Sequence, residues 1–269
     1  MCTVSWLHTP DGYHLLCNRD ERFTRQPAFG FRAHTRRGTR FISPRDGDQG
    51  GTWLAANEFG VTLCLVNRYP CRVCNGQETR QYRSRGLLVF DLADSKSLVE
   101  ARQRLERARL HCYRPFSIVV LEPGQAGLLF HWTGRYSLLE CNGDPSMPLI
   151  SSSFDQKGVE VYRRRLFHKL VGSRQSLDLD ALMAFHASHL PVESAYSTCM
   201  HREDAATVSF SWIEVTSKQV DFRYWPGPPC ALQLEPNAAS LKRRLPMAVA
   251  GPANRSLRPS VARQSEPSP

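Results

Sequence analysis

The sequence has no apolar run long enough to cross a lipid bilayer as a helix, which takes roughly 20 residues. Its N-terminal part also lacks the apolar stretch of a signal peptide and carries four consecutive charged side chains, from Arg19 to Arg22, instead. These two absences argue against stable membrane insertion and export, so we expect a cytoplasmic protein. The 9 cysteines are odd in number and scattered, which indicates reduced thiols in place of a disulfide framework.

A paired metal-binding motif is also missing. Cys71-Arg72-Val73-Cys74 has the two-residue gap of a metal or redox pair. A structural zinc site needs four ligands, however, and no second pair follows at a suitable spacing. The sequence therefore predicts no bound metal.

The sequence lacks a nucleic-acid-binding motif as well, although its formal net charge is +10. Half of this excess lies in residues 241–269, which contain six basic side chains and one acidic side chain. No recognition helix or aromatic platform accompanies the charge, so we set nucleic acid aside as a partner. Residues 246–269 are rich in Pro, Ser, Ala and Arg and poor in large apolar side chains, which predicts a disordered basic tail.

What is present favours a single folded unit over residues 1–245. Hydrophobic residues make up 41% of the chain, which is enough for a sizeable core, and no linker interrupts residues 1–232. Runs with strand character lie near both ends, and most helical patterns lie between them. This order predicts a layered α+β domain.

The predicted strands are short runs rich in β-branched and aromatic side chains. Residues 2–7 and 13–17 flank the turn Thr9-Pro10-Asp11-Gly12 and should form a hairpin. Residues 206–215 and 219–225 should form a second hairpin. The remaining predicted strands are 61–67, 116–121, 127–132 and 136–139.

The predicted helices have apolar side chains three and four residues apart. They cover residues 87–92, 97–110, 159–171 and 179–189. Ser97 and Glu100 form a capping-box pattern at the start of the second helix. The segment 68–85 has no such pattern, and because loops of this length often act as lids, it is the candidate for controlling access to a pocket.

Cys2 is the most informative residue for chemistry. A small second side chain allows the cell to remove the initiator methionine, which would leave a thiol and a free α-amine on one residue. Their reference pKa values, about 8.5 and roughly 7.7–8.0, allow proton exchange near neutral pH. A terminal amine can activate an adjacent nucleophile in this way. Because any chain can begin with Met-Cys, the prediction of a catalytic Cys2 depends on the residues that follow.

Those residues form motifs in a specific order. The chain carries Asn18-Arg19-Asp20-Glu21, Gly50-Gly51-Thr52-Trp53-Leu54, Gly60-Val61-Thr62-Leu63-Cys64-Leu65-Val66-Asn67, Ser84-Arg85-Gly86-Leu87-Leu88, Cys199-Met200-His201-Arg202, Thr207-Val208-Ser209 and Gly227-Pro228-Pro229-Cys230. With Cys2, this series resembles the NRDE family, also called the transport and Golgi organisation 2 family, over roughly residues 1–232. The resemblance implies an N-terminal nucleophile hydrolase-like fold, a four-layer αββα sandwich with mostly antiparallel sheets, similar to cysteine-type bile salt hydrolases and penicillin acylases.

The resemblance also implies a catalytic set. Cys2 would attack an acyl carbon, and Arg19 would favour its thiolate by lowering the thiol pKa. Asn67 would donate to the oxyanion of the tetrahedral intermediate. The alternatives are an ordinary surface ion pair for Arg19 and a strand-ending cap for Asn67.

Asp20 would accept hydrogen bonds from the α-amine, but its spacing departs from that of the resembled hydrolases. Those enzymes separate the arginine and the aspartate by two residues, whereas Arg19 and Asp20 are adjacent. Adjacent residues in a regular strand point to opposite faces. Both therefore line the pocket only if the strand ends or bulges there; otherwise Asn18 and Asp20 share one face, and Arg19 and Glu21 share the other.

The residues predicted to contact the substrate are Asn18, Gly51, Trp53, Ser152, His201 and Arg202. Gly51 would let the backbone approach a ligand closely, although two glycines are also typical of a turn. A second oxyanion asparagine should fall near residues 149–153, where this chain offers serines. His201 could supply a haem ligand or a pocket base. A histidine near the start of a strand more commonly forms its hydrogen bonds within the protein and has no such role.

Two functional classes stay open. The first is an N-terminal cysteine nucleophile amidohydrolase that acts on a small acyl amide through a thioester. The second is a carrier of haem or lipid without turnover, because the resemblance implies roles of eukaryotic relatives in Golgi organisation, secretion, lipid balance and haem trafficking. Cys2, Arg19 and Asn67 favour the enzyme. No cofactor is expected apart from haem as a carried ligand, and a homo-oligomer stays open.

Overall fold

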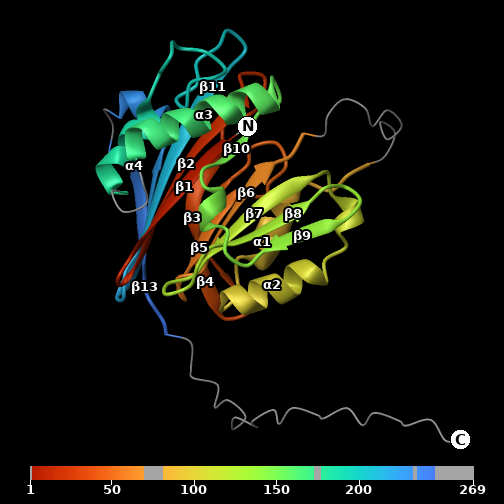
Figure 1. The fold of residues 1–269 in the computed structure, drawn as a ribbon. Helices are drawn as coiled ribbons and strands as arrows, with labels where there is room; N and C mark the ends of the chain where they lie inside the picture. The colour runs from red at the N-terminus through yellow and green to blue at the C-terminus, as the bar shows by residue number, and fades with distance from the viewer. Residues whose placement is uncertain (1, 70–80, 173–176, 233–234, 246–269) are drawn as a thin grey trace, which may run out of the picture.

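The computed structural model describes residues 2–69, 81–172, 177–232 and 235–245, which form two antiparallel sheets and four α-helices (Figure 1). The six-stranded sheet has the order β10-β1-β2-β11-β12-β13, with β1 (Cys2–Thr9), β2 (Gly12–Arg22), β10 (Leu149–Ser151), β11 (Ala205–Val215), β12 (Gln219–Trp225) and β13 (Asn237–Lys242). The seven-stranded sheet runs in sequence order, with β3 (Phe29–Arg36), β4 (Thr39–Arg45), β5 (Leu54–Asn57), β6 (Thr62–Asn67), β7 (Phe116–Leu121), β8 (Leu128–Trp132) and β9 (Ser137–Glu140). The helices are α1 (Arg85–Leu92), α2 (Leu98–Glu106), α3 (Gln156–Val171) and α4 (Leu179–Ala187).

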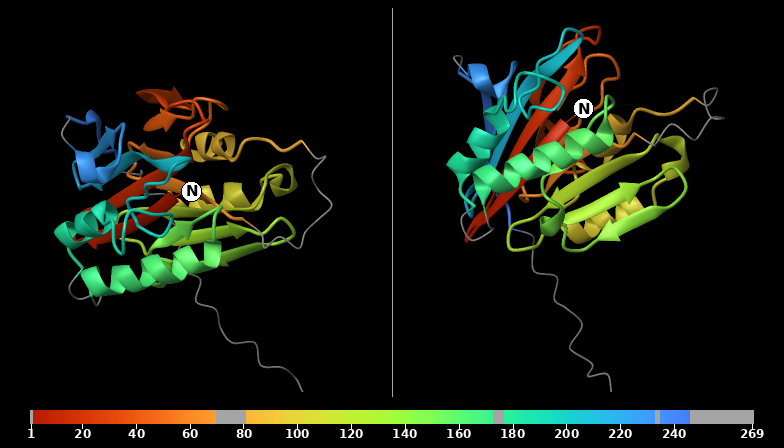
Figure 2. Two further views of the ribbon diagram at one scale, coloured as in Figure 1. Left: turned by 90° about the horizontal axis from the view of Figure 1, so that it is seen from above. Right: turned by 45° about the horizontal axis from the view of Figure 1, so that its top comes forward.

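The helices cover the outer faces of the two sheets. α3 and α4 pack on β10, β1 and β2, whereas α1 and α2 pack on strands β5 to β8 (Figure 2). Between the sheets, Leu15 and Ile213 share one core with Ile42 and Val119. This arrangement confirms the four-layer αββα sandwich.

Strands in the two middle layers are covered on both faces, and their sequences reflect it. All six residues of β7 are buried, as are the first five of β1. β7 is accordingly a nearly continuous apolar run, whereas β1 alternates apolar side chains with Thr3 and Ser5, which are buried as well. Both predicted hairpins, now β1–β2 and β11–β12, are confirmed.

The sequence analysis missed five strands, each for a local reason. β3 and β4 carry several arginines, and β13 consists mostly of small and polar residues. β5 and β10 have only 4 and 3 residues. Their pairing in the sheets, more than their own propensity, makes these segments strands.

α2 begins as predicted. The Ser97 side chain accepts a hydrogen bond from the backbone N–H of Glu100, at 3.1 Å. The Glu100 carboxylate caps the N–H of Lys96, at 2.8 Å, one residue before the position that a capping box uses. The helix ends at Glu106, earlier than the predicted 110, because a 3₁₀ turn, Leu110–Cys112, follows.

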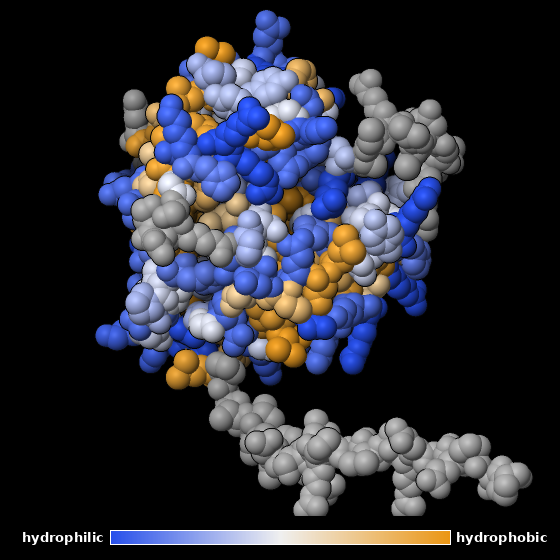
Figure 3. Space-filling model, viewed as in Figure 1, coloured by the Kyte–Doolittle hydropathy of each residue, from blue (hydrophilic) through white to orange (hydrophobic). Residues whose placement is uncertain are grey.

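The outer surface is mostly hydrophilic on the face shown in Figure 3, and hydrophobic side chains gather over β8 and β9. β9 is an edge strand whose Leu138 is 49% exposed. No helix in the described ranges is long and apolar enough to cross a membrane. The tail 246–269, the cysteine pair Cys71 and Cys74 and most of the expected lid 68–85 lie outside the described residues.

Candidate active site

The register of the six-stranded sheet gives Cys2 two specific neighbours. Arg19 on β2 lies opposite Cys2 on one side, and Ser151 on β10 lies opposite it on the other. Directly opposed residues of antiparallel strands share a face, with Cβ atoms about 4.5–5.5 Å apart. Cys2 is 8% exposed and borders a cavity of about 380 Å³. The strand pairing therefore brings the three side chains together, and Cys2 and Arg19 border the cavity.

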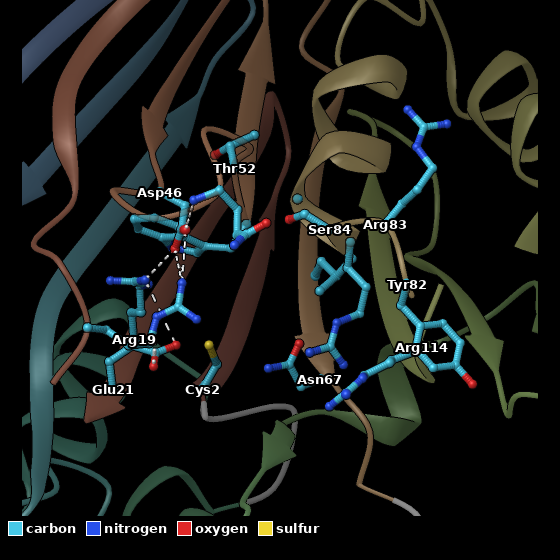
Figure 4. Close-up of a pocket in the computed structure, with 16 residues that line it drawn as sticks. Cys2, Arg19, Glu21, Asp46, Thr52, Asn67, Tyr82, Arg83, Ser84 and Arg114 are labelled. Carbon is cyan, nitrogen blue, oxygen red and sulfur yellow. Dashed lines mark hydrogen bonds and ion pairs between the residues drawn. The ribbon is translucent and has the colours of Figure 1, made fainter. Parts of the chain in front are cut away.

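The cavity has two walls of different origin. Figure 4 shows the Cys2 sulfur between a group formed by Arg19, Glu21 and Asp46 and a second group that includes Asn67 and Arg114. The first group comes from the β1–β2 hairpin and the turn after β4. The second comes from the end of β6 and the segment before β7. Residues 82–85, which belong to the segment 68–85 that the sequence predicts as a lid, also line the second wall.

Arg19 is held rigidly in its wall. Its Nη2 lies 2.8 Å from Asp46 Oδ2 and 3.9 Å from Glu21 Oε1, and its guanidinium carbon lies 4.3 Å from the centre of the Trp53 ring. Arg25 Nη2 contacts the same Asp46 oxygen, at 2.8 Å. The first wall thus balances its positive charge with carboxylates.

The second wall does not balance its charge in this way. Among the described residues, no carboxylate lies within ion-pair distance of Arg83, Arg85 or Arg114. Arg85 donates to the Pro115 carbonyl at 2.9 Å, and burial lowers the pKa of its guanidinium. Arg114 lies over the Tyr82 ring, 5.5 Å from its centre. The second wall is therefore suited to attract an anionic group.

Asn67 lies at the end of β6, as the sequence predicts, and its side chain borders the cavity. Its Nδ2 donates to the Tyr69 hydroxyl at 3.2 Å. An amide nitrogen has two N–H groups, so one can still donate to a ligand.

The environment of Cys2 favours the protonated form of its thiol. The neighbouring Cys17 thiol, which hydrogen-bonds to it, and burial both raise the pKa of Cys2 well above its ordinary value. Cys17 Sγ lies 3.9 Å from Cys64 Sγ in turn, so three thiols lead from the cavity into the core. Because the thiolate is the nucleophile, Cys2 needs a base before it can react.

Asn18 and Asp20 do not line the cavity, which corrects the expectation that Arg19 and Asp20 do so together. β2 continues as a strand through these residues. The register shift opposite Arg19 and Asp20 lies in β11, between Thr207 and Ser209, so alternate side chains of β2 still point to opposite faces. Arg19 and Glu21 border the cavity, while Asp20 accepts from Thr207 Oγ1 at 2.7 Å and from Arg163 Nη1 at 3.2 Å on the other side. Of the two arrangements that the sequence left open, the structure has the one in which Asn18 and Asp20 share one face of β2 and Arg19 and Glu21 share the other.

Asn18 is buried, and the protein uses both of its side-chain N–H groups. Its Nδ2 donates to the carbonyls of His186 and Thr198, both at 2.9 Å. Its Oδ1 must then accept from His186 Nδ1, at 2.9 Å, which leaves His186 Nε2 to accept from the Ser5 hydroxyl at 2.8 Å. This network fixes α4 on the back of β1 and β2.

Arg163 is a buried arginine that the sequence analysis missed. It is 1% exposed in the middle of α3, and its Nη1 lies 2.5 Å from Thr3 Oγ1 as well as close to Asp20. Its position shares the buried helix face of Val159 and Phe167, which is the signal that could have identified it. The run Arg163-Arg164-Arg165 hid this signal, because such a run is typical of a solvated face.

Trp53 borders the cavity as predicted, but Gly51 does not. A Cβ atom at Gly51 would lie 2.4 Å from the backbone carbon of Gly86. The close approach that requires a glycine is therefore to the start of α1, and Gly51 does not line the cavity. The Thr52 N–H donates to the Gly86 carbonyl at 3.0 Å and fixes this contact.

Ser151, and not Ser152, lies opposite Cys2. The Ser152 hydroxyl accepts from the Phe154 N–H at 3.2 Å, and its own N–H donates to Gln156 Oε1 at 2.7 Å, so it shapes the turn before α3. Ser151 Oγ is buried without a hydrogen-bond partner among the described residues. This buried hydroxyl therefore lies next to Cys2 with its hydrogen-bonding capacity unused by the described residues.

His201 and Arg202 lie outside the Cys2 cavity. His201 borders a neighbouring cavity of about 500 Å³, whose wall includes Arg19 and Glu21. Arg202 pairs with Asp204 at 2.7 Å and lies over the Phe154 ring. The prediction that both contact the same substrate as Cys2 is not supported by these positions.

Comparison with solved structures defines the class of fold. The N-acylethanolamine-hydrolyzing acid amidase ortholog of Caenorhabditis elegans has a TM-score of 0.54 at 14% identity, covering 79% of this chain and 92% of that one. A mutant of the conjugated bile acid hydrolase of Clostridium perfringens has a TM-score of 0.55 at 12% identity, covering 89% and 92%. Penicillin V acylase of Agrobacterium tumefaciens has a TM-score of 0.50 at 11% identity, covering 90% and 86%. The chain has the N-terminal nucleophile hydrolase fold.

The family follows from the sequence. The family model described as "Transport and Golgi organisation 2" matches residues 1–197, so the chain belongs to that family. No curated protein matches the sequence.

Proposed function

We propose that this protein is an N-terminal cysteine nucleophile amidohydrolase that cleaves a small acyl amide. The observation that carries the proposal is the position of Cys2 at the cavity edge, with Arg19 and Ser151 opposite it in register and Asn67 on the facing wall. The structural neighbours support this class, since their names describe an amidase, a bile acid hydrolase and an acylase.

The reaction begins once removal of Met1 has freed the α-amine of Cys2. The thiol proton moves to this amine, directly or through water, and Sγ attacks the amide carbon. The carbon–sulfur bond forms, the carbon–nitrogen bond breaks, and the leaving amine takes the proton. Water then cleaves the thioester, which releases a carboxylic acid and restores the thiol.

The oxyanion of each tetrahedral intermediate needs donors fixed in advance. We assign this role to Asn67 Nδ2 and to the Ser151 hydroxyl, whose oxygen has no other hydrogen-bond partner among the described residues. Arg19, fixed by Asp46, supplies positive charge beside the developing thiolate.

The charge of the cavity narrows the substrate class. The described lining contains more arginines than carboxylates, with Arg19, Arg25, Arg83, Arg85 and Arg114 against Glu21 and Asp46. We therefore propose an acyl amide that carries a carboxylate or another anionic group. This lining suits a lipid chain poorly, because Trp53, Leu65 and Tyr82 are its only large apolar or aromatic side chains in the described residues. The neighbouring cavity of about 500 Å³, which Phe23 and Tyr224 help to line, would suit an apolar chain better and is where the carrier alternative would place one.

The test is a hydrolysis assay with matched pairs of N-acyl amides that differ in one carboxylate. We expect turnover of the anionic member, an acyl adduct on Cys2 by intact mass, and loss of both in Cys2→Ala. Cys141→Ala, at an exposed cysteine, is the control and should keep both. Arg114→Gln should raise KM for the anionic substrate and leave KM for its neutral partner unchanged.

Turnover that survives in Cys2→Ala would contradict the proposal. So would haem or acyl-chain binding that survives in Cys2→Ala with no amide cleaved by the wild-type chain, because that result describes a carrier.

A further inference from the structure

Four potential metal ligands converge away from the Cys2 cavity. They are His189 after α4, Cys199 and His201 before β11, and Cys230 in the 3₁₀ turn Pro229–Ala231. Each offers one ligand atom, and these four atoms all lie within 4.8 Å of one another. Two thiols and two imidazoles are the ligand set of a Cys₂His₂ zinc site.

The distances around His201 match a tetrahedral site. His201 Nε2 lies 3.5 Å from Cys199 Sγ and 3.5 Å from Cys230 Sγ. Zinc bonds of about 2.3 Å to sulfur and about 2.0–2.1 Å to nitrogen place sulfur and nitrogen ligands roughly 3.6 Å apart in a tetrahedron. The His189 and His201 rings meet edge to face, with centres 5.0 Å apart, so the two rings can point at one ion.

His189 adds an independent observation. Its Nε2 is buried and has no hydrogen-bond partner among the described residues. A buried polar atom without a partner costs free energy unless something binds it. The other ring nitrogen, Nδ1, lies 3.7 Å from Glu193 Oε1. This distance is within ion-pair range but too long for a hydrogen bond, so Glu193 does not fix the orientation of the ring.

The location gives such an ion a structural role. Residues 188–204 connect α4 to β11 without a helix or strand, which is long for a connection inside a compact domain. This segment lies behind the nucleophile strands, since Asn18 donates to the Thr198 carbonyl. An ion bound by His189, Cys199 and His201 would cross-link the beginning and the end of this segment. Its bond to Cys230 would link the segment to the turn after β12.

We propose that His189, Cys199, His201 and Cys230 form a structural Zn²⁺ site. Thiolate and imidazole together favour Zn²⁺ over hard cations such as Mg²⁺ or Ca²⁺. Four protein ligands leave no open position, so the ion takes no part in substrate binding. The sequence analysis predicted no metal because it searched for closely spaced pairs, whereas these ligands are spread over residues 189–230 and only the fold brings them together.

The first test is the metal content of the full chain purified under reducing conditions without a chelator. We expect one zinc per chain in the wild type and less than about a tenth of that in Cys230→Ser. Cys2→Ser and Cys141→Ser are the controls, because a terminal cysteine and an exposed cysteine can bind zinc adventitiously; both should keep the metal. Loss of zinc in either control to the same degree as in Cys230→Ser would overturn the proposal.

The second test replaces zinc with Co²⁺ in the metal-free wild-type chain. We expect the intense visible bands of tetrahedral cobalt and a thiolate charge-transfer band, both saturating at one equivalent and both lost in Cys230→Ser. Chelation should lower the Tm of the wild type by about 5–10 °C and leave that of Cys230→Ser unchanged. Absence of these bands in the wild type, or a Cys199–Cys230 disulfide in place of metal, would overturn the proposal. None of these readouts depends on amide hydrolysis.

Discussion

Two adjacent serines, Ser151 and Ser152, differ in their contacts because they occupy different positions at the end of β10. Both are small, polar and buried, and the sequence gives no reason to separate them. The register of β10 against β1 does separate them, because it places Ser151 opposite Cys2. The hydrogen bonds of Ser152 to residues 154 and 156 give it a local role instead.

Ser151→Ala and Ser152→Ala should therefore differ in kinetics. If the Ser151 hydroxyl stabilises the oxyanion, its loss lowers kcat by about 10²–10³-fold with little change in KM, as expected for one oxyanion donor. Ser152→Ala should leave kcat within about threefold and lower stability by about 1 kcal/mol, through the lost turn hydrogen bond. Steady-state kinetics of both variants on one amide substrate checks this, and equal kcat values for the two variants would contradict the assignment.

His186 should make the protein sensitive to acid. Burial lowers the pKa of its ring to about 3, so the folded chain keeps it neutral. The unfolded ring has a pKa of about 6.5, so between pH 3 and 6.5 the unfolded state binds more protons and the free energy of unfolding falls as the pH falls. This one group contributes a slope of up to about 1.4 kcal/mol per pH unit in that window and none above it.

Urea unfolding of the wild type and His186→Gln at pH 7 and pH 4.5 measures this slope. The variant is expected to be less stable at pH 7, because it loses hydrogen bonds to Ser5 and Asn18, and to approach the wild type at pH 4.5. His111→Gln, at an exposed position, is the control. A stability difference between wild type and His186→Gln that stays constant across this range would show that the buried ring does not titrate as described.

At the scale of elements, the packing of the β4–β5 connection on α1 depends on Gly51. Ala at this position would drive a Cβ into the Gly86 backbone, which cannot move without shifting the start of α1. We expect Gly51→Ala to cost about 1–3 kcal/mol of unfolding free energy, the usual range for overpacking.

Gly38→Ala separates this clash from backbone strain. Gly38 has φ +74° with no atom near its Cβ position, so its substitution tests strain alone, at about 1 kcal/mol. Urea denaturation should show the larger loss in Gly51→Ala. A smaller loss there than in Gly38→Ala would mean that the contact with α1 adapts easily.

The sequence predicted elements well where local patterning and tertiary environment agree. The two hairpins and the runs that became β6, β7 and β8 have turns or β-branched residues that identify them. The prediction failed where pairing alone makes a strand, as in the three residues of β10. This failure mattered for the site, because β10 carries Ser151.

For the molecule as a whole, the spatial distribution of charge could not be obtained from composition. The sequence showed that half of the +10 excess lies near the C-terminus. Only the fold shows that Arg83, Arg85 and Arg114, from two separate segments, line one wall of the Cys2 cavity. The sequence left two arrangements of β2 open, and the structure was needed to choose between them, because the register shift near Arg19 and Asp20 lies in β11 and not in β2.

The central claim is that Cys2 is an activated N-terminal nucleophile. The most direct measurement is intact mass and peptide mapping after brief treatment with a substoichiometric thiol-directed electrophile at pH 7. The account predicts a chain without Met1 and a label on Cys2 in clear preference to the other cysteines, including the exposed Cys141. A retained Met1, or a label that follows exposure and leaves Cys2 unmodified, would contradict it.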